Sequence, residues 1–199
     1  MGLAAIFLLF ALFCGSHGSE DTVVKRATGR EYYSVLSVDN GRSWGSWANT
    51  ELCPTGFYAT GFSLKVEQFQ AQGDDTAVNG IRLYCSRQGR SHWSHIESKS
   101  GPWGEWTSVQ FCPFGLLKSF QLRVEPHQGD GDDTAVNNIR FQCSVSGRLE
   151  GNGMSWGNWG KWSSECPYGG ICGIQTRVEA PQGNGDDTAL NDVRFLCCV

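Results

Sequence analysis

The sequence predicts an all-β protein built from three internal repeats. Two observations lead to this prediction. Three sequence blocks return in the same order at matching offsets, and apolar residues within the blocks alternate with polar ones. Alternation with a period of two is typical of strands that bury one face and expose the other to water, as in antiparallel sheets. Clusters of glycine, asparagine and aspartate between the runs indicate turns.

Three blocks define the repeat. The first starts with Trp-Gly-x-Trp and leads to Cys-Pro, the second is a six-residue run that ends in Val-Glu, and the third runs from Gly-Asp-Asp-Thr-Ala to a cysteine. The blocks begin at Trp44, Trp103 and Trp156, then at Phe62, Phe120 and Ile174, and finally at Gly73, Gly131 and Gly185. Three ordered blocks that recur together exclude coincidence and indicate a repeat architecture.

The strands expected in each repeat have one apolar face. In the first repeat Phe62, Leu64 and Val66 alternate with Ser63 and Lys65, and the other two repeats follow the same pattern. A unit of about 55 residues with so little apolar material is a poor independent domain. We therefore expect three small antiparallel sheets that turn their apolar faces toward a common axis, as in a three-sided prism or a closed three-bladed structure.

The N-terminus predicts secretion. Residues 3–14 form an uncharged apolar run that is too short to cross a bilayer, and small residues follow at Ser16 and Gly18. We expect a signal peptide at residues 1–18; a buried N-terminal helix is the alternative. Residues 19–31 are expected to form a flexible tail with a dibasic Lys25-Arg26. Residues 32–199 then form one domain, with repeats at about 32–90, 91–147 and 148–199.

Charge and composition exclude several partners. Sixteen Lys and Arg against 20 Asp and Glu give a net charge of −4. This balance argues against nucleic acid, which requires clustered basic surface, and against electrostatic docking on anionic membranes. No second long apolar run follows the first, so no membrane insertion is expected. The sequence also contains no Asn-x-Ser/Thr acceptor for N-glycosylation.

The cysteines predict a disulfide framework. Nine are present, and Cys14 leaves with the signal peptide, so eight remain, as expected for an oxidised secreted protein. Equivalent cysteines in equivalent repeats should form equivalent bonds, and the two left over should pair with each other. The expected pairs are Cys53–Cys85, Cys112–Cys143, Cys166–Cys197 and Cys172–Cys198.

Together with the Cys197-Cys198 pair, the three sets of blocks resemble the vitelline membrane outer layer protein I family, from about Tyr32 to Val199. The resemblance implies a β-prism of three four-stranded Greek-key sheets around a pseudo-threefold axis. It also implies a secreted component of the outer layer of the egg's vitelline membrane. The family's prism is similar in architecture to certain plant lectins. A rival resemblance, to thrombospondin type-1 repeats, fails because those carry six cysteines in a similar length.

The paired aspartates invite a catalytic or calcium-binding interpretation, but their threefold repetition favours structural turns. Neighbouring carboxylates on a strand point to opposite faces, whereas a glycosidase needs two that face each other. The segment also lacks the ligand spacing of an EF-hand. Isolated His92, His95 and His127 do not predict a zinc site, so no metal, cofactor or catalytic residue is expected. The expected turn residues are Asp74, Asp75, Asp132, Asp133, Asp186 and Asp187.

Candidate glycan contacts are an aromatic residue and three polar-face carboxylates: Trp93, Glu67, Glu125 and Glu179. The alternative is that these glutamates form ordinary cross-strand charge pairs with Lys65, Arg123 or Arg177, or with the strand arginines Arg82, Arg140 and Arg194. The Trp-x-x-Trp spacing also resembles the acceptor site for C-mannosylation, but simple packing of these tryptophans at the sheet ends is the favoured interpretation.

The sequence therefore predicts a non-enzymatic, extracellular structural protein of a coat. A lectin-like or glycan-modifying protein that acts on amino-sugar polymers is the alternative. The expected partners are coat proteins or glycans, with the soluble protein a monomer.

Overall fold

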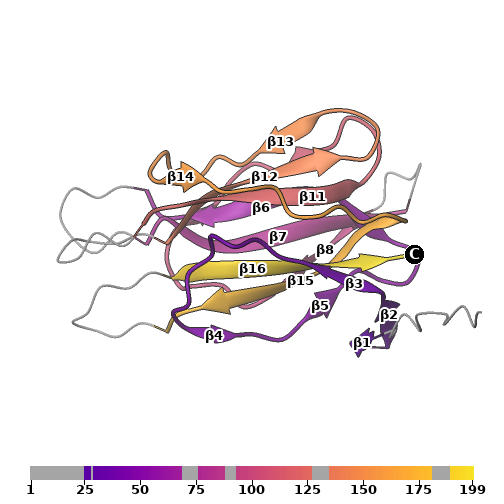
Figure 1. The fold of residues 1–199 in the computed structure, drawn as a ribbon, viewed down its shortest axis with the longest axis horizontal. Helices are drawn as coiled ribbons and strands as arrows, with labels where there is room; N and C mark the ends of the chain where they lie inside the picture. Colours follow the sequence, from indigo (N-terminus) through magenta and orange to yellow (C-terminus); the bar gives the residue numbers. More distant parts are fainter. Residues whose placement is uncertain (1–24, 28, 69–75, 88–92, 127–134, 181–188) are drawn as a thin grey trace, which may run out of the picture.

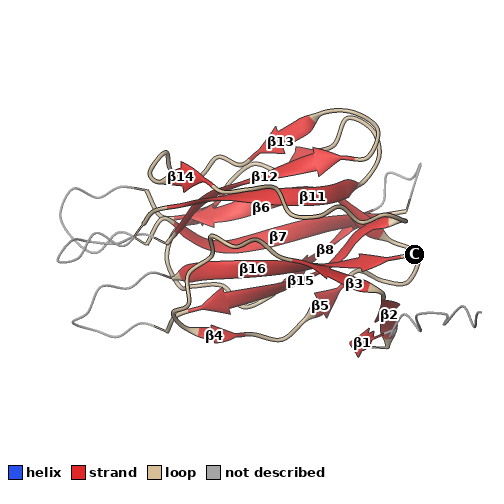
Figure 2. Cartoon of the chain, in the orientation of Figure 1, coloured by secondary structure: helices blue, strands red, loops and turns tan. Residues whose placement is uncertain are grey.

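The chain folds into strands throughout its described part. The computed structural model describes residues 25–27, 29–68, 76–87, 93–126, 135–180 and 189–199. Within these ranges all regular elements are β-strands, and no helix is present (Figure 2). The all-β prediction is confirmed. Except for one small hairpin, the strands form three antiparallel sheets whose long central strands run side by side along the molecule (Figure 1).

The first sheet is a Greek key. Its strands are β6 (Tyr58–Val66), β7 (Val78–Ser86), β8 (Trp93–Glu97), β9 (Glu105–Trp106) and β10 (Gln110–Phe111). The hairpin β6–β7 pairs Phe62 with Leu83, β8 extends it beside β7, and the chain then returns to the free edge of β6. Both β9 and β10 pair with that edge, so they act as one interrupted fourth strand.

The second sheet repeats this order. Its strands are β11 (Leu117–Val124), β12 (Val136–Cys143), β13 (Arg148–Glu150) and β14 (Asn158–Trp159). They lie in the order β13-β12-β11-β14, which matches β8-β7-β6-β9 of the first sheet. The register pairs Phe120 with Phe141, so each strand of the central hairpin brings a phenylalanine to the same level.

The third sheet is assembled from both ends of the chain. Its strands are β15 (Gly170–Val178), β16 (Leu190–Cys198), β3 (Ser34–Leu36), β4 (Ser46–Trp47) and β5 (Glu51–Leu52). The N-terminal β3 pairs with the C-terminal β16, and β4 and β5 pair with β15. The sheets therefore do not coincide with the expected sequence repeats, because the Trp-Gly-x-Trp block that opens each repeat completes the preceding sheet.

The core lies where the three sheets meet. Four phenylalanines, one or two from each sheet, form a contiguous cluster: Phe62, Phe120, Phe141 and Phe195, with ring centres 4.7 to 6.5 Å apart. The expected apolar faces of the central hairpins are all buried, in line with the alternation. Ser63 differs from expectation. It is buried on the outer face, where its hydroxyl lies 3.4 Å from that of Tyr84.

Three of the four disulfides join one sheet to the next. Cys53 hydrogen-bonds through its N–H to the carbonyl of Cys172 in the third sheet, and its sulfur is bonded to Cys85 in the first. The other intersheet bonds are Cys112–Cys143 and Cys166–Cys197, whereas Cys172–Cys198 lies within the third sheet. These are the pairs that repeat symmetry predicts. Because each sequence repeat spans two sheets, a bond inside one repeat fastens two sheets together.

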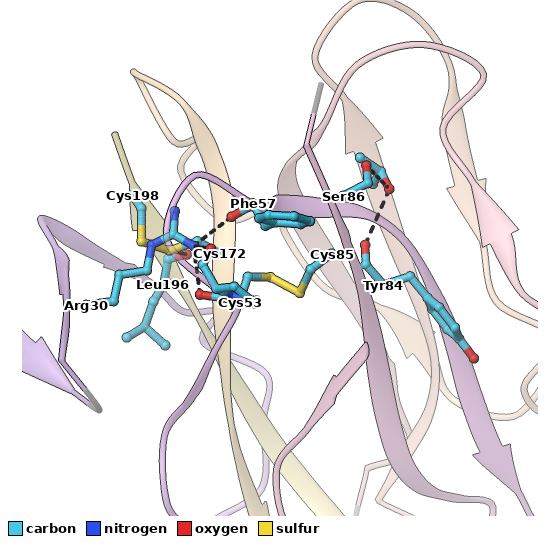
Figure 3. Close-up of a disulfide and its surroundings, with 11 residues drawn as sticks. Arg30, Cys53, Phe57, Tyr84, Cys85, Ser86, Cys172, Leu196 and Cys198 are labelled. Carbon is cyan, nitrogen blue, oxygen red and sulfur yellow. Dashed lines mark hydrogen bonds between the residues drawn. A yellow bond between two sulfur atoms is a disulfide. The ribbon is translucent and has the colours of Figure 1, made fainter. Parts of the chain in front are cut away.

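A short N-terminal hairpin covers one end of the third sheet. It consists of β1 (Lys25–Ala27) and β2 (Arg30–Tyr32). Figure 3 shows the guanidinium of Arg30 beside two disulfides; its Nη1 donates to the carbonyl oxygens of Cys53, Pro54 and Phe57 at 2.9, 2.8 and 2.6 Å. Arg30, near the end of the expected tail at 19–31, is thus anchored through one side chain that satisfies several turn carbonyls. Residues 19–24 lie outside the described part, so the flexible tail stays a prediction there.

Candidate functional site

An arginine stacks on the second tryptophan of each Trp-Gly-x-Trp block. The guanidinium carbons of Arg82, Arg140 and Arg194 lie 3.8, 3.9 and 3.9 Å from the ring centres of Trp106, Trp159 and Trp47. At this distance a cation is attracted by the electron-rich face of the indole. The outer face of each sheet therefore carries the same Arg–Trp stack.

The glycine of each block allows the chain to approach the neighbouring strand. Gly45, Gly104 and Gly157 adopt φ of +73°, +80° and +73°, a conformation that side chains with a Cβ rarely adopt. A Cβ there would also collide with the backbone at Val178, Val66 or Val124. Glycine thus places the following tryptophan against the central hairpin.

The glutamates singled out in the sequence lie beside this stack. Glu67, Glu125 and Glu179 directly follow β6, β11 and β15, and their N–H groups donate to the carbonyls of Ala77, Ala135 and Ala189. The Glu67 carboxylate also accepts hydrogen bonds from the N–H and hydroxyl of Thr76, at 3.2 and 2.6 Å. These bonds hold the glutamates in equivalent places at one end of the prism.

Two of these glutamates line pockets together with a stacked tryptophan. The pocket at Glu67 and Trp106 has a volume of about 490 Å³. The pocket at Glu125 and Trp159 has a volume of about 450 Å³ and lies between the second and third sheets. The loop at residues 39–42 forms its second wall. An aromatic ring next to a carboxylate and polar loop groups can contact both the apolar face and the hydroxyls of a sugar.

Arg42 and Asn40 join the two walls of the second pocket. Arg42 Nη2 donates to the carbonyl of Glu125 at 2.7 Å, and Asn40 Nδ2 donates to that of Leu122 at 3.1 Å. Asn40 Oδ1 is buried and has no hydrogen-bond partner among the residues that the structure describes. The N-terminal loop is therefore fixed against the second sheet, with one acceptor left for a further donor.

One carboxyl behind the same loop is electrostatically unusual. Burial raises the pKa of Asp192 to about 6, although a hydrogen bond from Val193 and the charges of Arg194 and Arg177 act against this shift. Gly41 packs directly on the carboxyl, since a Cβ at Gly41 would overlap it. The equivalent positions in the other sheets are Gly80 and Asn138, both neutral, so Asp192 breaks the threefold repeat.

The structure tests only part of the sequence-predicted site. The six turn aspartates, Asp74, Asp75, Asp132, Asp133, Asp186 and Asp187, lie outside the described residues. Trp93 begins β8, but its side chain also lies outside the described part. Arg82 forms a salt bridge with Glu97, and Arg140 forms one with Glu150. The pairing of Glu67, Glu125 and Glu179 with the strand arginines stays a prediction.

Sequence reasoning missed the residues that complete the pockets. Trp106 and Trp159 belong to the repeated blocks, but they were expected only to pack. Arg42 and Asn40 carry no repeat signal. In the part of the chain that the structure describes, no group of three or more His, Cys, Asp or Glu side chains is arranged to hold a metal ion. No helix among the described residues is long and apolar enough to span a membrane.

Comparison with known proteins finds one family over most of the chain. The family model described as Vitelline membrane outer layer protein I (VOMI) matches residues 34–199. A Mus musculus protein named vitelline membrane outer layer protein 1 homolog is 48% identical over 199 residues, covering 98% of this chain and 96% of its own. The Homo sapiens protein of the same name is 53% identical over 170 residues, covering 84% of each.

Solved structures with a similar fold include several lectins. Single-chain recombinant jacalin aligns with a TM-score of 0.54 at 10% identity, over 91% of this chain and 100% of its own. Artocarpin, solved with mannopentose, gives a TM-score of 0.52 at 12% identity, over 82% and 97%. A mannose-binding lectin from champedak gives 0.51 at 12% identity, over 83% and 97%. At such low identity the likeness establishes the β-prism fold alone.

Proposed function

Because the chain belongs to the vitelline membrane outer layer protein I family, we propose that it is a secreted, non-enzymatic structural component of an extracellular coat. Its relatives are named as homologs of a vitelline membrane outer layer protein. The apolar run at residues 3–14 has the length of a signal peptide core, and disulfide-rich domains are typical of oxidising extracellular environments.

The observation that carries this proposal is the intersheet disulfide set. Cys53–Cys85, Cys112–Cys143 and Cys166–Cys197 each fasten the edge of one sheet to the central hairpin of the next. No sheet can leave the prism without breaking a covalent bond. Proteases cleave segments that have locally unfolded, and the intersheet disulfides restrict such unfolding. A prism closed in this way is therefore appropriate for a coat that must persist outside the cell.

Expression of the full chain in animal cells tests the proposal. We expect the protein in the medium and in the detergent-insoluble extracellular fraction, with all four disulfides formed in a non-reducing peptide map. A variant that lacks residues 2–18 is the matched control and should stay inside the cell. Retention of the unmodified chain in the cytosol with free thiols would contradict the proposal.

Glycan binding is the second candidate function, and the pocket at Glu125 and Trp159 favours it. The aligned neighbours include a protein titled mannose-binding lectin and a complex with mannopentose, and this chain shares their fold. The pocket places an indole, a carboxylate and the polar loop 39–42 around one space. These are the groups that a lectin uses to bind a sugar.

A glycan array probed with the secreted protein tests this second function. Saturable binding to one glycan class that Glu125→Gln weakens would support it. Glu165→Gln is the matched control, because Glu165 is an exposed glutamate that does not line this pocket. Absence of saturable binding to any glycan would exclude it and would leave the structural role untouched.

A further inference from the structure

The two tryptophans of each Trp-Gly-x-Trp block have different surroundings. The second ring is stacked under an arginine, as in Trp47 under Arg194 and Trp106 under Arg82. The first ring is exposed: Trp44 retains 56% and Trp103 50% of its accessible surface. Both exposed rings are therefore accessible from solvent, whereas the second ring of each block is covered on one face by a guanidinium.

The exposed rings are held in fixed places. Gly45 and Gly104 follow them with positive φ and close backbone packing, as described above. The N–H of Trp103 donates to Oδ1 of the buried Asn79 at 3.3 Å. The backbone is therefore well anchored, while about half of each ring faces water. Packing accounts for a tryptophan at the second position of the block. It does not account for the exposed half of the tryptophan at the first position.

The spacing of these rings matches a known covalent chemistry. Trp-x-x-Trp is the acceptor pattern for C-mannosylation, in which the first tryptophan receives the sugar. We propose that Trp44 and Trp103 each carry one mannose linked to indole C2. This inference rests on the proposed function in one respect: the chain must enter the secretory pathway, where the mannosyl donor is found.

The reaction balances without an oxidant. The donor is mannose bound through C1 to a polyprenyl phosphate. The π electrons of the indole form a new bond from C2 to C1 of the sugar, and the bond from C1 to phosphate oxygen breaks with its electron pair on the phosphate. The proton on C2 then leaves to a base, which restores the aromatic ring. The products are the mannosyl-tryptophan and the polyprenyl phosphate.

Trp44 and Trp103 are each about half exposed, which is compatible with an attached sugar. A hexose on the exposed part of either ring would extend into solvent and would replace apolar surface by hydroxyl groups. The Arg194–Trp47 and Arg82–Trp106 stacks lie on the other tryptophan of each block and remain in place. Trp156, the third equivalent ring, is less exposed than the other two, so the first two blocks are the clearer acceptors.

Peptide mass spectrometry tests the proposal. The full chain is expressed in an animal cell line together with a reporter whose Trp-x-x-Trp site those cells modify, and peptides are prepared from both the medium and the cells. The peptides that contain Trp44 and Trp103 should each carry one hexose. Fragmentation should leave the hexose on the first tryptophan with loss of part of the sugar ring, which is the signature of a carbon–carbon link.

Variants make the assignment specific. Trp44→Phe and Trp103→Phe should each remove one hexose and leave the other in place, whereas the peptide with Trp93, which has no such motif, should be unmodified throughout. If Trp44 and Trp103 are unmodified while the reporter is modified, the inference is wrong. It is also wrong if fragmentation of these peptides releases an intact hexose from Ser or Thr, which would show an O-linked sugar. Failure of secretion would instead contradict the proposed function. The peptides prepared from the cells would then still show whether Trp44 and Trp103 carry a hexose.

Discussion

The guanidinium of Arg194 in the last strand lies 3.9 Å above the ring centre of Trp47, which belongs to the N-terminal part of the chain. The contact joins β16 to β4 across the outer face of β15, and Arg177 approaches the same ring at 5.9 Å. Since Arg82 and Trp106, and Arg140 and Trp159, form the same pair, the stack is a repeated link between each central hairpin and its fourth strand.

We expect the Arg194–Trp47 contact to stabilise the closed third sheet. A double-mutant cycle with Arg194→Met and Trp47→Leu should give a coupling free energy of about 0.5–1 kcal/mol, because the pair is only partly shielded from water. The measurement is denaturant unfolding with the disulfides intact. Additive single-mutant effects would show that the ring and the guanidinium do not interact.

The intersheet disulfides should contribute more to stability than any single noncovalent contact. Replacement of both Cys112 and Cys143 by alanine should lower the free energy of unfolding by about 3–4 kcal/mol. The two cysteines are 31 residues apart in the sequence, and without the bond the unfolded chain between them is no longer held in a closed loop. Limited proteolysis should then cut the variant faster. The double alanine variant of Cys172 and Cys198 is the comparison, since that bond stays within one sheet. Equal resistance of wild type and the Cys112/Cys143 variant would contradict the intersheet role.

The half-buried carboxyl of Asp192 should make stability depend on pH. Its pKa is raised to about 6 in the folded protein from 3.8, so the folded state binds the proton more tightly than the unfolded chain. The contribution of this group to stability is therefore fully present below about pH 4 and is lost as pH rises through about 6.

Replacement of Asp192 by asparagine, the residue at the equivalent Asn138, should remove that loss. At pH 7.5 we expect Asp192→Asn to be more stable than wild type by about 1–2 kcal/mol, with a smaller difference at pH 4.5. Chemical unfolding at both pH values measures this, with the exposed Asp39→Asn as control. A pH-independent difference would show that the Asp192 carboxyl does not titrate in this range.

The repeated aspartates are predicted to act as structural turns. Asp75→Ala, Asp133→Ala and Asp187→Ala should each lower stability by a similar amount of about 1 kcal/mol, because each leaves backbone N–H groups without an acceptor. Melting temperatures with calcium and with EDTA provide the test. A large increase with calcium, or one variant that loses ligand binding at full stability, would favour a functional site.

Strand identity was predictable because burial follows a period of two. The alternation at Phe62, Leu64 and Val66 indicates which face of the strand is buried, independently of which sheet packs against it. The equivalent positions of the cysteines in the repeats indicate which cysteines form disulfides with each other. The composition of the sheets was not predictable in the same way. A threefold repeat can be divided at any point. The pairing of β3 with β16, and of β4 and β5 with β15, shows that the third sheet takes its outer strands from the N-terminal part of the chain.

The site was less predictable than the fold for a related reason. Asp192 occupies a strand position that is otherwise neutral, and its burial depends on Gly41 from the opposite end of the chain. The pocket at Glu125 likewise depends on Arg42, which donates to the Glu125 carbonyl across a sheet boundary. Contacts of this kind carry no local sequence signal, because they arise only when the first and last segments share a sheet.

Binding of a labelled chain that lacks the predicted signal peptide, residues 1–18, to isolated outer layer of an egg's vitelline membrane tests the structural role most directly. The layer is divided into one portion stripped of glycans by glycosidases and one whose proteins have been digested. If the protein is a structural coat component, binding should survive glycan removal and disappear after protein digestion. Binding that is lost with the glycans and kept after digestion would contradict the structural role and identify a lectin.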